Sequence, residues 1–573
     1  MARFILSDLL PFVLFPSLIL LHLFIAPYTK VEESFNIQAT HDIISYGIPP
    51  EHNPTEFLKA NYDHFEFPGV VPRTFVGALV LSGLARPFKG IVQGFDRQLL
   101  VRAILGLSNA AALIYYAVGV RKAFGRAVGI WYTLFQASQF HIMYYASRTL
   151  PNMFAFGLTT VALRNFLPIP SVATDPSVAT KRYRLALYLL TLTGIIFRSE
   201  VAILLFTVTV TLLFRSNSPQ NTIKSIIIPA GLGGGLLGLL ITIPIDSYFW
   251  QRFPLWPELA AFTYNVLDNN ASNWGISPWY TYFTNSLPRL FMNPLGLQIL
   301  APLTMGVPSL RQQALPILIP AFHYILMYSY QPHKEWRFII YALPPLTVTI
   351  FALPGSWMFQ RRSKALFYRV VSFLLVLSVA SSYVAQTGML VISSLNYPGA
   401  VALSRVHTLA PHYSPDKRIV SVHMDTLSCT TGISRFLEIP PPATMIGDGA
   451  RNATLWIYDK TESEKKKQDP IFWERFDYVI AERPEKVLGK WELLEVVEGF
   501  KSVRIMRPGD AFPPLKHADS GGVIAQSYYQ LADWARRNIT KGWWLGIRME
   551  PMLSILKAGA GQHGLGFPTY TAN

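Results

Sequence analysis

Hydrophobic residues in this sequence form long runs, with few charged positions, through the first 391 residues. A helix needs roughly 17 to 25 apolar residues to cross a bilayer, and runs of this kind recur along the chain. The pattern therefore predicts a polytopic α-helical membrane protein with about 11–12 transmembrane helices. The predicted apolar stretches lie at 9–27, 70–92, 99–120, 127–146, 150–167, 185–214, 225–245, 294–308, 314–330, 338–355 and 365–391.

Charged residues interrupt the apolar pattern at two places. Arg198 and Glu200 lie inside 185–214, which predicts two short helices with a break between them, and Arg148 lies between the stretches 127–146 and 150–167. Because charges within a membrane are costly, such residues are functional candidates, and ion pairing inside the helix bundle is the structural alternative. Side chains at positions i and i+2 of a helix diverge, so helix geometry disfavours an Arg198–Glu200 pair.

The composition becomes mixed and polar after residue 391. Short runs typical of β-strands are followed by a helical segment, and they lie at 418–423, 454–458, 478–481, 502–506 and 526–537. The pattern predicts a small C-terminal α/β domain, which we expect on the lumenal side. The chain then divides into a membrane domain over 1–391, the α/β domain over 392–510 and a less ordered tail over 511–573.

Charge and composition fix the orientation of the predicted helices. Basic residues cluster in the loops 168–184 and 356–364, which the positive-inside rule places in the cytoplasm. The segments 246–293 and 331–337 then lie on the lumenal side. Only 15% of residues are charged despite a net charge of +16, and no nucleic-acid-binding motif accompanies that charge.

Two adjacent carboxylates, Glu32 and Glu33, directly follow the first apolar stretch and open a polar segment over 28–68. Like charges side by side raise one another's pKa, and partial burial adds to this, so one carboxylate could serve as a general base. The alternative is an ordinary helix start, where the helix dipole favours acidic residues.

The same polar segment ends in ionisable residues that alternate with aromatic ones: Asp63, His64 and Glu66. Sugar-binding sites use this mixture, since rings stack on the apolar faces of sugars and carboxylates accept hydroxyl protons. An aromatic belt at the membrane interface has the same composition, so both interpretations stand on this evidence.

A third group of candidates lies in the short loop 331–337. The spacing places His333 and Arg337 on one face of a helix that Pro332 is suited to begin, and helix N-termini bind anions. Lys334 adds positive charge, so the loop is a candidate phosphate site. A basic interface that snorkels to the membrane surface is the alternative.

Several chemistries have no support in the sequence. Cys429 is the only cysteine, which excludes an intrachain disulfide and a cysteine-based metal site. The chain has neither a glycine-rich phosphate loop nor an Asp-x-Asp motif. These features argue against a metal-dependent transferase that uses a nucleotide sugar.

Together these segments resemble the dolichyl-phosphate-mannose-dependent mannosyltransferases of glycosyltransferase family 22, in the GT-C superfamily. His333-Lys-Glu-Trp-Arg-Phe matches the family's His-Lys-Glu-x-Arg-Phe signature. Other segments are similar to the branch that adds the α-1,6-linked eighth mannose to the lipid-linked N-glycan precursor: 27–42, 63–74, 147–152, 246–250 and 272–275. The resemblance spans roughly residues 20–440.

The resemblance implies a GT-C fold and transfer of mannose from dolichyl-phosphate-mannose to Man7GlcNAc2-PP-dolichol, giving Man8GlcNAc2-PP-dolichol. It further implies an inverting single displacement that needs no metal or other cofactor, in a multi-pass protein of the endoplasmic reticulum membrane whose active site faces the lumen. The partners are then the two dolichol-linked substrates and membrane lipids, with no nucleic acid.

The resemblance also implies roles for the candidate residues. We expect Glu32 to be the base and Glu33 its partner, with the reverse order as the alternative. The residues expected to hold the donor phosphate are His333, Lys334, Arg337 and Arg198. Those expected to meet sugar hydroxyls of the acceptor are Asp63, His64, Glu66 and Arg148.

Two other functions compete with this one. An α-1,2-mannosyltransferase of the same family is disfavoured because residues 31–34 read Val-Glu-Glu-Ser, with no Asp-Glu pair. A lipid transporter or scramblase would also place charges within the membrane, but the sequence shows no duplicated half with matching broken helices.

Overall fold

The computed structural model describes residues 6–49, 52–88, 90–170, 174–413, 419–440, 454–510 and 530–559. The chain forms two compact units. The first unit comprises residues 1–27 and 32–390, and the second comprises residues 28–31 and 391–573. The chain therefore leaves the first unit for only four residues directly before Glu32.

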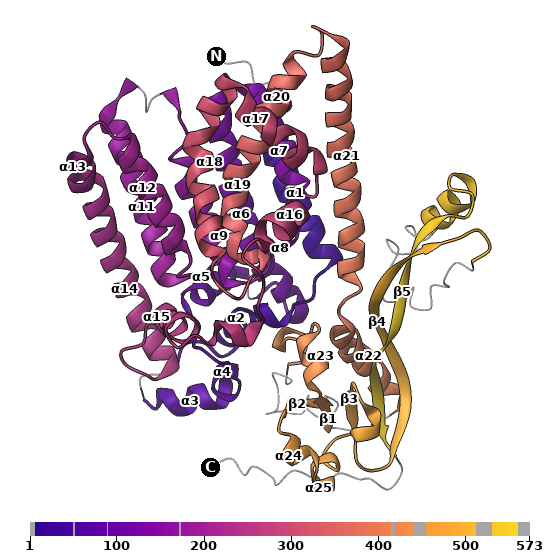
Figure 1. The fold of residues 1–573 in the computed structure, drawn as a ribbon. Coiled ribbons are helices and arrows are strands. Elements are labelled where there is room, and N and C mark those ends of the chain that lie inside the picture. The colour runs from indigo at the N-terminus through magenta and orange to yellow at the C-terminus, as the bar shows by residue number, and fades with distance from the viewer. Residues whose placement is uncertain are drawn as a thin grey trace. The chain divides into compact units, whose positions relative to one another are not determined.

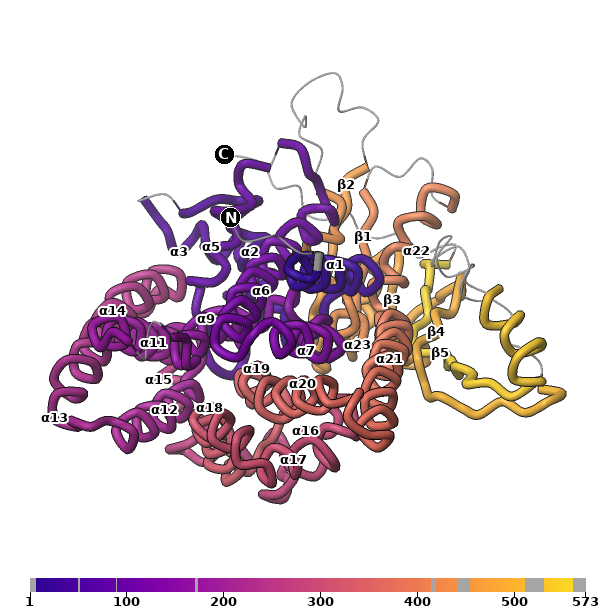
Figure 2. The backbone as a smooth tube through the Cα atoms, turned by 90° about the horizontal axis from the view of Figure 1, so that it is seen from above, coloured from indigo at the N-terminus to yellow at the C-terminus, as the bar shows by residue number. Residues whose placement is uncertain are grey.

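The first unit is a bundle of helices (Figure 1). Viewed along their axes, α14, α11, α9, α6 and α1 form a row in which each helix contacts the next (Figure 2). Their bounds are α1 Leu10–Ile25, α6 Gly94–Phe124, α9 Pro151–Arg164, α11 Pro176–Ile196 and α14 Ile228–Trp250.

A second set of helices packs beside this row, with α12 contacting both α11 and α18. These elements are α7 Arg126–Ala137, α8 Phe140–Tyr145, α12 Val201–Arg215, α13 Pro219–Thr222, α16 Leu287–Phe291, α17 Ala301–Gly306, α18 Pro308–Tyr328, α19 Leu343–Leu346, α20 Leu353–Gln360 and α21 Leu366–Ser394. Short helices occupy the polar segments: α2 Ser34–Tyr46, α3 Pro54–Asn61, α4 Asp63–Glu66 and α15 Pro257–Phe262. The short helix α5 Val76–Ala85 is apolar.

Four described helical segments are long and apolar enough to cross a membrane: Gly94–Phe124, Pro219–Trp250, Trp336–Gln360 and Leu366–Ser394. Three shorter apolar helices accompany them: Leu10–Ile25, Val76–Phe88 and Val201–Arg215. Together with the fold similarity reported below, these helices support the membrane fold. The figure of 11–12 spans stays a prediction.

The break predicted within 185–214 is confirmed, since α11 ends at Ile196 and α12 begins at Val201. The start of α11 follows from local chemistry. The Asp175 carboxylate accepts a hydrogen bond from Ser177 N at 2.8 Å, and Pro176 stands at the first helical position, where its missing N–H costs nothing.

The second unit contains a five-stranded sheet in the order β2-β1-β3-β5-β4. Strand β1 pairs in parallel with β2 and β3, and β5 pairs antiparallel with β3 and β4. Apolar side chains of the strands pack with α22 in one core, which includes Val406, Val422, Ile480 and Ile555. The bounds are β1 Ile419–Met424, β2 Leu455–Asp459, β3 Tyr478–Ala481, β4 Trp491–Met506, β5 Trp544–Ala558, α22 Pro398–Tyr413, α23 Thr426–Thr430, α24 Glu464–Lys467 and α25 Pro470–Trp473.

The prediction of a less ordered tail over 511–573 is wrong for its strand β5. Strand β5 lies between β3 and β4, and its residues Leu553, Ile555 and Leu556 are buried. Its first part is only partly buried and includes charged residues, which obscures the alternating pattern that identifies a strand. The second unit therefore extends well past the predicted boundary at residue 510.

Candidate active site

The two adjacent carboxylates occupy very different environments in a 3-10 turn, Val31–Glu33, which leads into α2. Glu33 is 1% exposed, and its Oε1 lies 2.5 Å from Nη1 of Arg148. Glu32 is exposed and forms no ion pair with any residue that the structure describes. The charge of Glu33 is thus balanced, whereas the carboxylate of Glu32 is available to accept a proton.

Arg148 is buried with Glu33, and a sugar could not reach it in this structure. Its guanidinium lies 4.0 Å from the ring centroid of Tyr144, and Nη2 donates to the carbonyl of Ala26 at 3.3 Å. A cation in such apolar surroundings requires a counter-charge, which Glu33 supplies. The structure therefore does not support the expected contact between Arg148 and the acceptor, and shows Arg148 paired with Glu33 instead.

The residues that lead into α9 connect the carboxylate pair to a second buried charged group. Thr149 Oγ1 donates to the backbone carbonyl of Glu33 at 3.3 Å, and Asn36 Nδ2 donates to the Thr149 carbonyl at 2.7 Å. Three residues later, Asn152 Nδ2 donates to Glu200 Oε1 at 2.9 Å. The segment 149–152 therefore contacts both Glu33 and Glu200.

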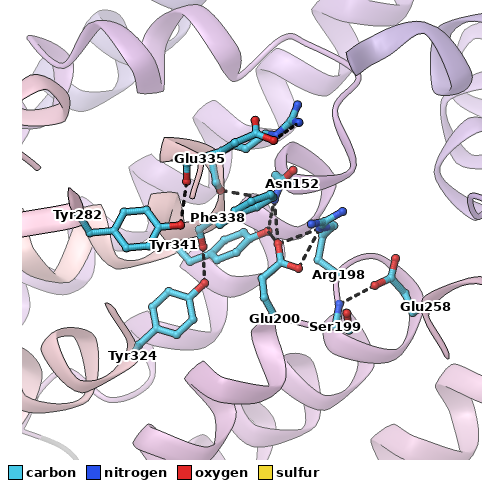
Figure 3. Close-up of polar contacts among 11 residues, drawn as sticks. Asn152, Arg198, Ser199, Glu200, Glu258, Tyr282, Tyr324, Glu335, Phe338 and Tyr341 are labelled. Atoms are coloured by element: carbon cyan, nitrogen blue, oxygen red, sulfur yellow. Dashed lines mark hydrogen bonds and ion pairs between the residues drawn. The ribbon is translucent and has the colours of Figure 1, made fainter. Parts of the chain in front are cut away.

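Arg198 and Glu200 form the ion pair that helix geometry disfavoured. Arg198 Nε lies 2.8 and 3.0 Å from the two oxygens of Glu200, and the Tyr341 hydroxyl donates to the same carboxylate at 3.2 Å (Figure 3). The argument from helix geometry does not apply here, because both residues lie in the non-helical break between α11 and α12. Side chains at positions i and i+2 can converge in such a break. Arg198 remains 14% exposed, so it can still meet a ligand.

The basic loop 331–337 does not begin a helix at Pro332, as predicted. A 3-10 helix begins only at Trp336, with Glu335 as its cap. His333 and Arg337 are brought together by Glu335 rather than by a shared helix face. Glu335 Oε1 lies 2.9 Å from His333 Nε2 and 2.7 Å from Arg337 Nη2. Burial acts to raise the pKa of Glu335, but Arg337 and His333 outweigh it and lower the pKa below its ordinary value.

Contacts with the preceding segment 246–293 and with α18 hold the loop in place. Lys334 Nζ donates to the carbonyls of Ser277 and Gln331 at 2.9 and 2.6 Å. The Tyr282 hydroxyl donates to the Glu335 carbonyl at 3.3 Å, and that of Tyr324 donates to the Phe338 carbonyl. Burial lowers the pKa of Lys334. The loop thus presents its cations from a fixed backbone.

Aromatic packing connects the basic loop to the carboxylate pair. The ring centroids of Trp336 and Tyr145 lie 4.2 Å apart, and Tyr145 is close enough to interact electrostatically with Glu32 and Glu33. The Arg337 carbonyl also accepts a weak bond of 3.4 Å from Asn152. The structure therefore brings two of the predicted groups into one region, a general-base candidate and a set of cations.

The third predicted group is not brought to this region as a unit. His64 is 5% exposed in a core of aromatic rings, and its Nε2 lies 2.9 Å from the carbonyl of Phe249. Burial lowers its pKa, so this histidine is a packed core residue rather than a sugar ligand. Asp63 N donates to Asp42 Oδ2 at 2.9 Å, and Glu66 is exposed. Asp63, His64 and Glu66 belong to the short helix α4. In a helix, ionisable residues that alternate with aromatic ones do not all lie on one face.

Glu258 is a functional candidate that the sequence did not reveal. Its Oε2 accepts a hydrogen bond from Ser199 N at 2.6 Å, directly beside Arg198 (Figure 3). Burial raises the pKa of Glu258 to about 7, against the opposing effect of Arg198. Its only sequence cue is a position after Pro257 at the start of α15, which resembles an ordinary helix start.

The described residues contain no group of three or more His, Cys, Asp or Glu side chains arranged to hold a metal ion. The candidate groups in this region are the exposed carboxylate of Glu32 and the cations that the protein backbone and the glutamates hold in place. This combination suits deprotonation of a hydroxyl together with stabilisation of an anionic leaving group.

Comparisons with known proteins identify a family and several relatives with similar sequences. Residues 11–438 match the profile of the Alg9-like mannosyltransferase family. The Dol-P-Man:Man(7)GlcNAc(2)-PP-Dol alpha-1,6-mannosyltransferase of Saccharomyces cerevisiae is 35% identical over 527 residues, covering 84% of this chain and 86% of that protein. The Arabidopsis thaliana protein of the same name is 31% identical, covering 86% and 90%. GPI alpha-1,2-mannosyltransferase 3 of Homo sapiens is 25% identical, covering 59% and 57%.

The fold is similar to that of a solved membrane glycosyltransferase. The crystal structure of ArnT from Cupriavidus metallidurans bound to undecaprenyl phosphate superposes with a TM-score of 0.54, covering 97% of this chain and 98% of that chain. The sequences are 12% identical, so this likeness concerns the fold alone. It confirms the predicted GT-C architecture.

Proposed function

The chain belongs to the Alg9-like mannosyltransferase family, and we propose that it transfers mannose from dolichyl-phosphate-mannose to Man7GlcNAc2-PP-dolichol in α-1,6 linkage. Relatives named for this reaction are 31–35% identical over at least 84% of the chain. Relatives named GPI alpha-1,2-mannosyltransferase 3 match at most 60% of it at 25–28% identity. This difference favours the α-1,6 reaction over its α-1,2 alternative, and membership of a transferase family sets aside a transporter or scramblase.

One observation in the structure carries the proposed mechanism: the exposed carboxylate of Glu32 stands near a loop of fixed cations. Glu32 removes the proton of the acceptor 6-hydroxyl as that oxygen attacks the anomeric carbon of mannose. The bond from this carbon to the phosphate oxygen breaks, and dolichyl phosphate leaves with the electron pair. A single displacement converts the β-linked donor into an α-linked product. Glu33 keeps its charge against Arg148 and supports the turn that carries Glu32.

The leaving phosphate is stabilised by cations that the structure already holds in place. Arg337, Arg198, Lys334 and His333 supply donors from rigid backbone positions. Each of the two arginines now shares its charge with a glutamate, Glu335 or Glu200. A bound phosphate would share these arginines with their glutamates, because a guanidinium has five N–H donors. Preorganised donors of this kind stabilise charge without reorganisation during the reaction.

The same proposal places the protein in the endoplasmic reticulum membrane with its active site on the lumenal side. The positive-inside rule places loops 168–184 and 356–364 in the cytoplasm, and counting from them puts loop 331–337 in the lumen. Both substrates carry dolichol, which confines them to the same membrane. Partners are therefore the two lipid-linked substrates and surrounding lipids.

The proposal is tested with purified protein, dolichyl-phosphate-mannose and a seven-mannose acceptor. We expect one added mannose whose linkage analysis shows an α-1,6 bond. An α-1,2 bond would show that the protein has the alternative activity. If no mannose were added to this acceptor, the proposal would be rejected.

Chelation should leave the activity unchanged. The proposed reaction uses a carboxylate base and protein cations in place of a metal, so transfer rates with and without EDTA should agree. Loss of activity that manganese or magnesium restores would contradict the role given to the cations of loop 331–337.

Replacement of Arg337 by Ala should weaken use of the donor. The phosphate loses a charge-assisted hydrogen bond worth about 1.5–3 kcal/mol, so we expect the donor KM to rise or turnover to fall by roughly one to two orders of magnitude. Steady-state kinetics with varied donor measures this. Arg311→Ala, at an exposed position of α18, is the control. Unchanged kinetics in Arg337→Ala would show that the loop is structural.

A further inference from the structure

Arg73 differs from the other arginines of the candidate site in having no counter-charge of its own. Arg148, Arg198 and Arg337 each form an ion pair. Arg73 is half-buried between α4 and α5, and its side chain makes no hydrogen bond or ion pair with any residue in the described part of the chain. A half-buried guanidinium without an ion pair is costly, and an anionic ligand would supply the missing counter-charge.

The backbone on both sides of this guanidinium is fixed by the end of α14. Trp250 Nε1 donates to the Arg73 carbonyl at 2.9 Å. Asp246, fully buried, accepts from Thr74 Oγ1 at 2.9 Å and from Phe75 N at 2.7 Å. A buried carboxylate and an indole thus serve to hold Arg73 and the residues after it. The side chain is presented from a rigid support, as preorganised binding groups are.

The side chain of Arg73 faces the charged cluster. It lines a small cavity together with residues from several elements: Asn36, Thr74, Pro151, Phe154, Phe197 and Glu258. It also interacts electrostatically with Arg198 and Arg337, whose like charges oppose its own, and with Glu258 and Glu200. Three guanidiniums therefore converge on one region, close to Asn36 of the helix that follows Glu33.

We propose that Arg73 binds the phosphate of the lipid-linked mannose donor, together with Arg198 and Arg337. The inference rests on the proposed function and adds a residue to its site. Arg198 and Arg337 are each already paired with a glutamate, whereas Arg73 forms no ion pair with any residue that the structure describes. A guanidinium presents two parallel N–H groups to two phosphate oxygens, a geometry that lysine cannot reproduce. The donor phosphodiester carries one negative charge and the departing dolichyl phosphate carries up to two, so the repulsion among the three cations is relieved most as the leaving group forms.

The experiment compares Arg73→Gln and Arg73→Lys with the wild-type protein, using dolichyl-phosphate-mannose and the seven-mannose acceptor in turn as the varied substrate. Loss of a charge-assisted contact should raise the donor KM about 10- to 100-fold in Arg73→Gln, with a smaller rise in Arg73→Lys. Inhibition by dolichyl phosphate, which carries the phosphate without mannose, should weaken in parallel. The acceptor KM should stay the same. Arg252→Gln, an exposed arginine just beyond α14, is the matched control and should behave as the wild type.

The outcomes separate the possible explanations. A rise in the acceptor KM alone would assign Arg73 to the acceptor diphosphate and overturn the proposal. Loss of thermal stability in both variants, with unchanged donor KM and dolichyl phosphate inhibition, would make Arg73 structural and also overturn it. Wild-type kinetics in both variants would refute the inference while leaving the proposed function intact, because that function is tested by the product and linkage that the wild-type protein forms.

Discussion

Glu32→Gln should lower turnover by about 10²–10⁴-fold, the usual contribution of a general base, while both lipid substrates still bind. The amide keeps the size and most hydrogen-bonding capacity of the carboxylate but cannot accept the proton of the acceptor hydroxyl. Because Glu32 is exposed and pairs with no described residue, the substitution should leave stability unchanged. Single-turnover kinetics at saturating donor and acceptor measures the effect without interference from binding.

Glu33→Gln is the matched control, since it alters the neighbouring carboxylate by the same chemistry. It should slow turnover less than Glu32→Gln but destabilise the protein more, because Arg148 loses its buried counter-charge. If Glu32→Gln kept near-normal turnover while Glu33→Gln was stable but inactive, Glu33 would be the base and Glu32 its partner. If neither substitution slowed the reaction, the base would have to be sought at Asp63 or Glu66.

The sequence was a good guide to the fold wherever a pattern had one physical cause. Long apolar runs predicted the helices of the first unit, and charges inside 185–214 predicted the break between α11 and α12. The three parallel strands were also predicted, since short apolar runs bounded by polar residues leave little choice. Strand β5 was missed because only part of it is buried, which left no clear periodicity.

The candidate site was predicted less completely than the fold. The sequence identified Glu32, Glu33 and the basic loop, because ionisable groups beside apolar runs require an explanation. It could not show that Glu335 would gather His333 and Arg337, since that depends on a 3-10 helix starting late. Glu258 and Arg73 were missed because they come from segments far apart in the chain, and only folding brings them beside Arg198.

Burial alone distinguished residues that look alike in the sequence. Arg148 and Arg198 both interrupt apolar runs, yet one is enclosed with Glu33 and the other stays partly exposed beside Glu200. His64 lies in an aromatic core, whereas His333 lies in an accessible loop. Exposure cannot be read from residue type at such positions, because it depends on neighbours contributed by other helices.

Arg148→Met should destabilise the protein by about 3–5 kcal/mol, the cost of leaving one charge of a buried pair without its partner. Glu33 would then lie 1% exposed with its counter-charge removed. Thermal unfolding in a fixed detergent and at a fixed scan rate should show a lower midpoint than the wild type. Arg164→Met, which removes an arginine stacked on Tyr115 that forms no ion pair among the described residues, is the control for loss of packing.

The double variant Glu33→Gln/Arg148→Met provides the decisive comparison. It removes both charges, so the penalty for an unpaired buried charge disappears, and its stability should exceed that of either single variant. Its turnover should exceed that of Arg148→Met and approach that of Glu33→Gln, because Glu32 remains in place to accept the proton. Additive losses in the double variant would mean that Glu33 and Arg148 act independently. In that case the turn carrying Glu32 would owe its position to the hydrogen bonds of Thr149 and Asn36 rather than to the ion pair.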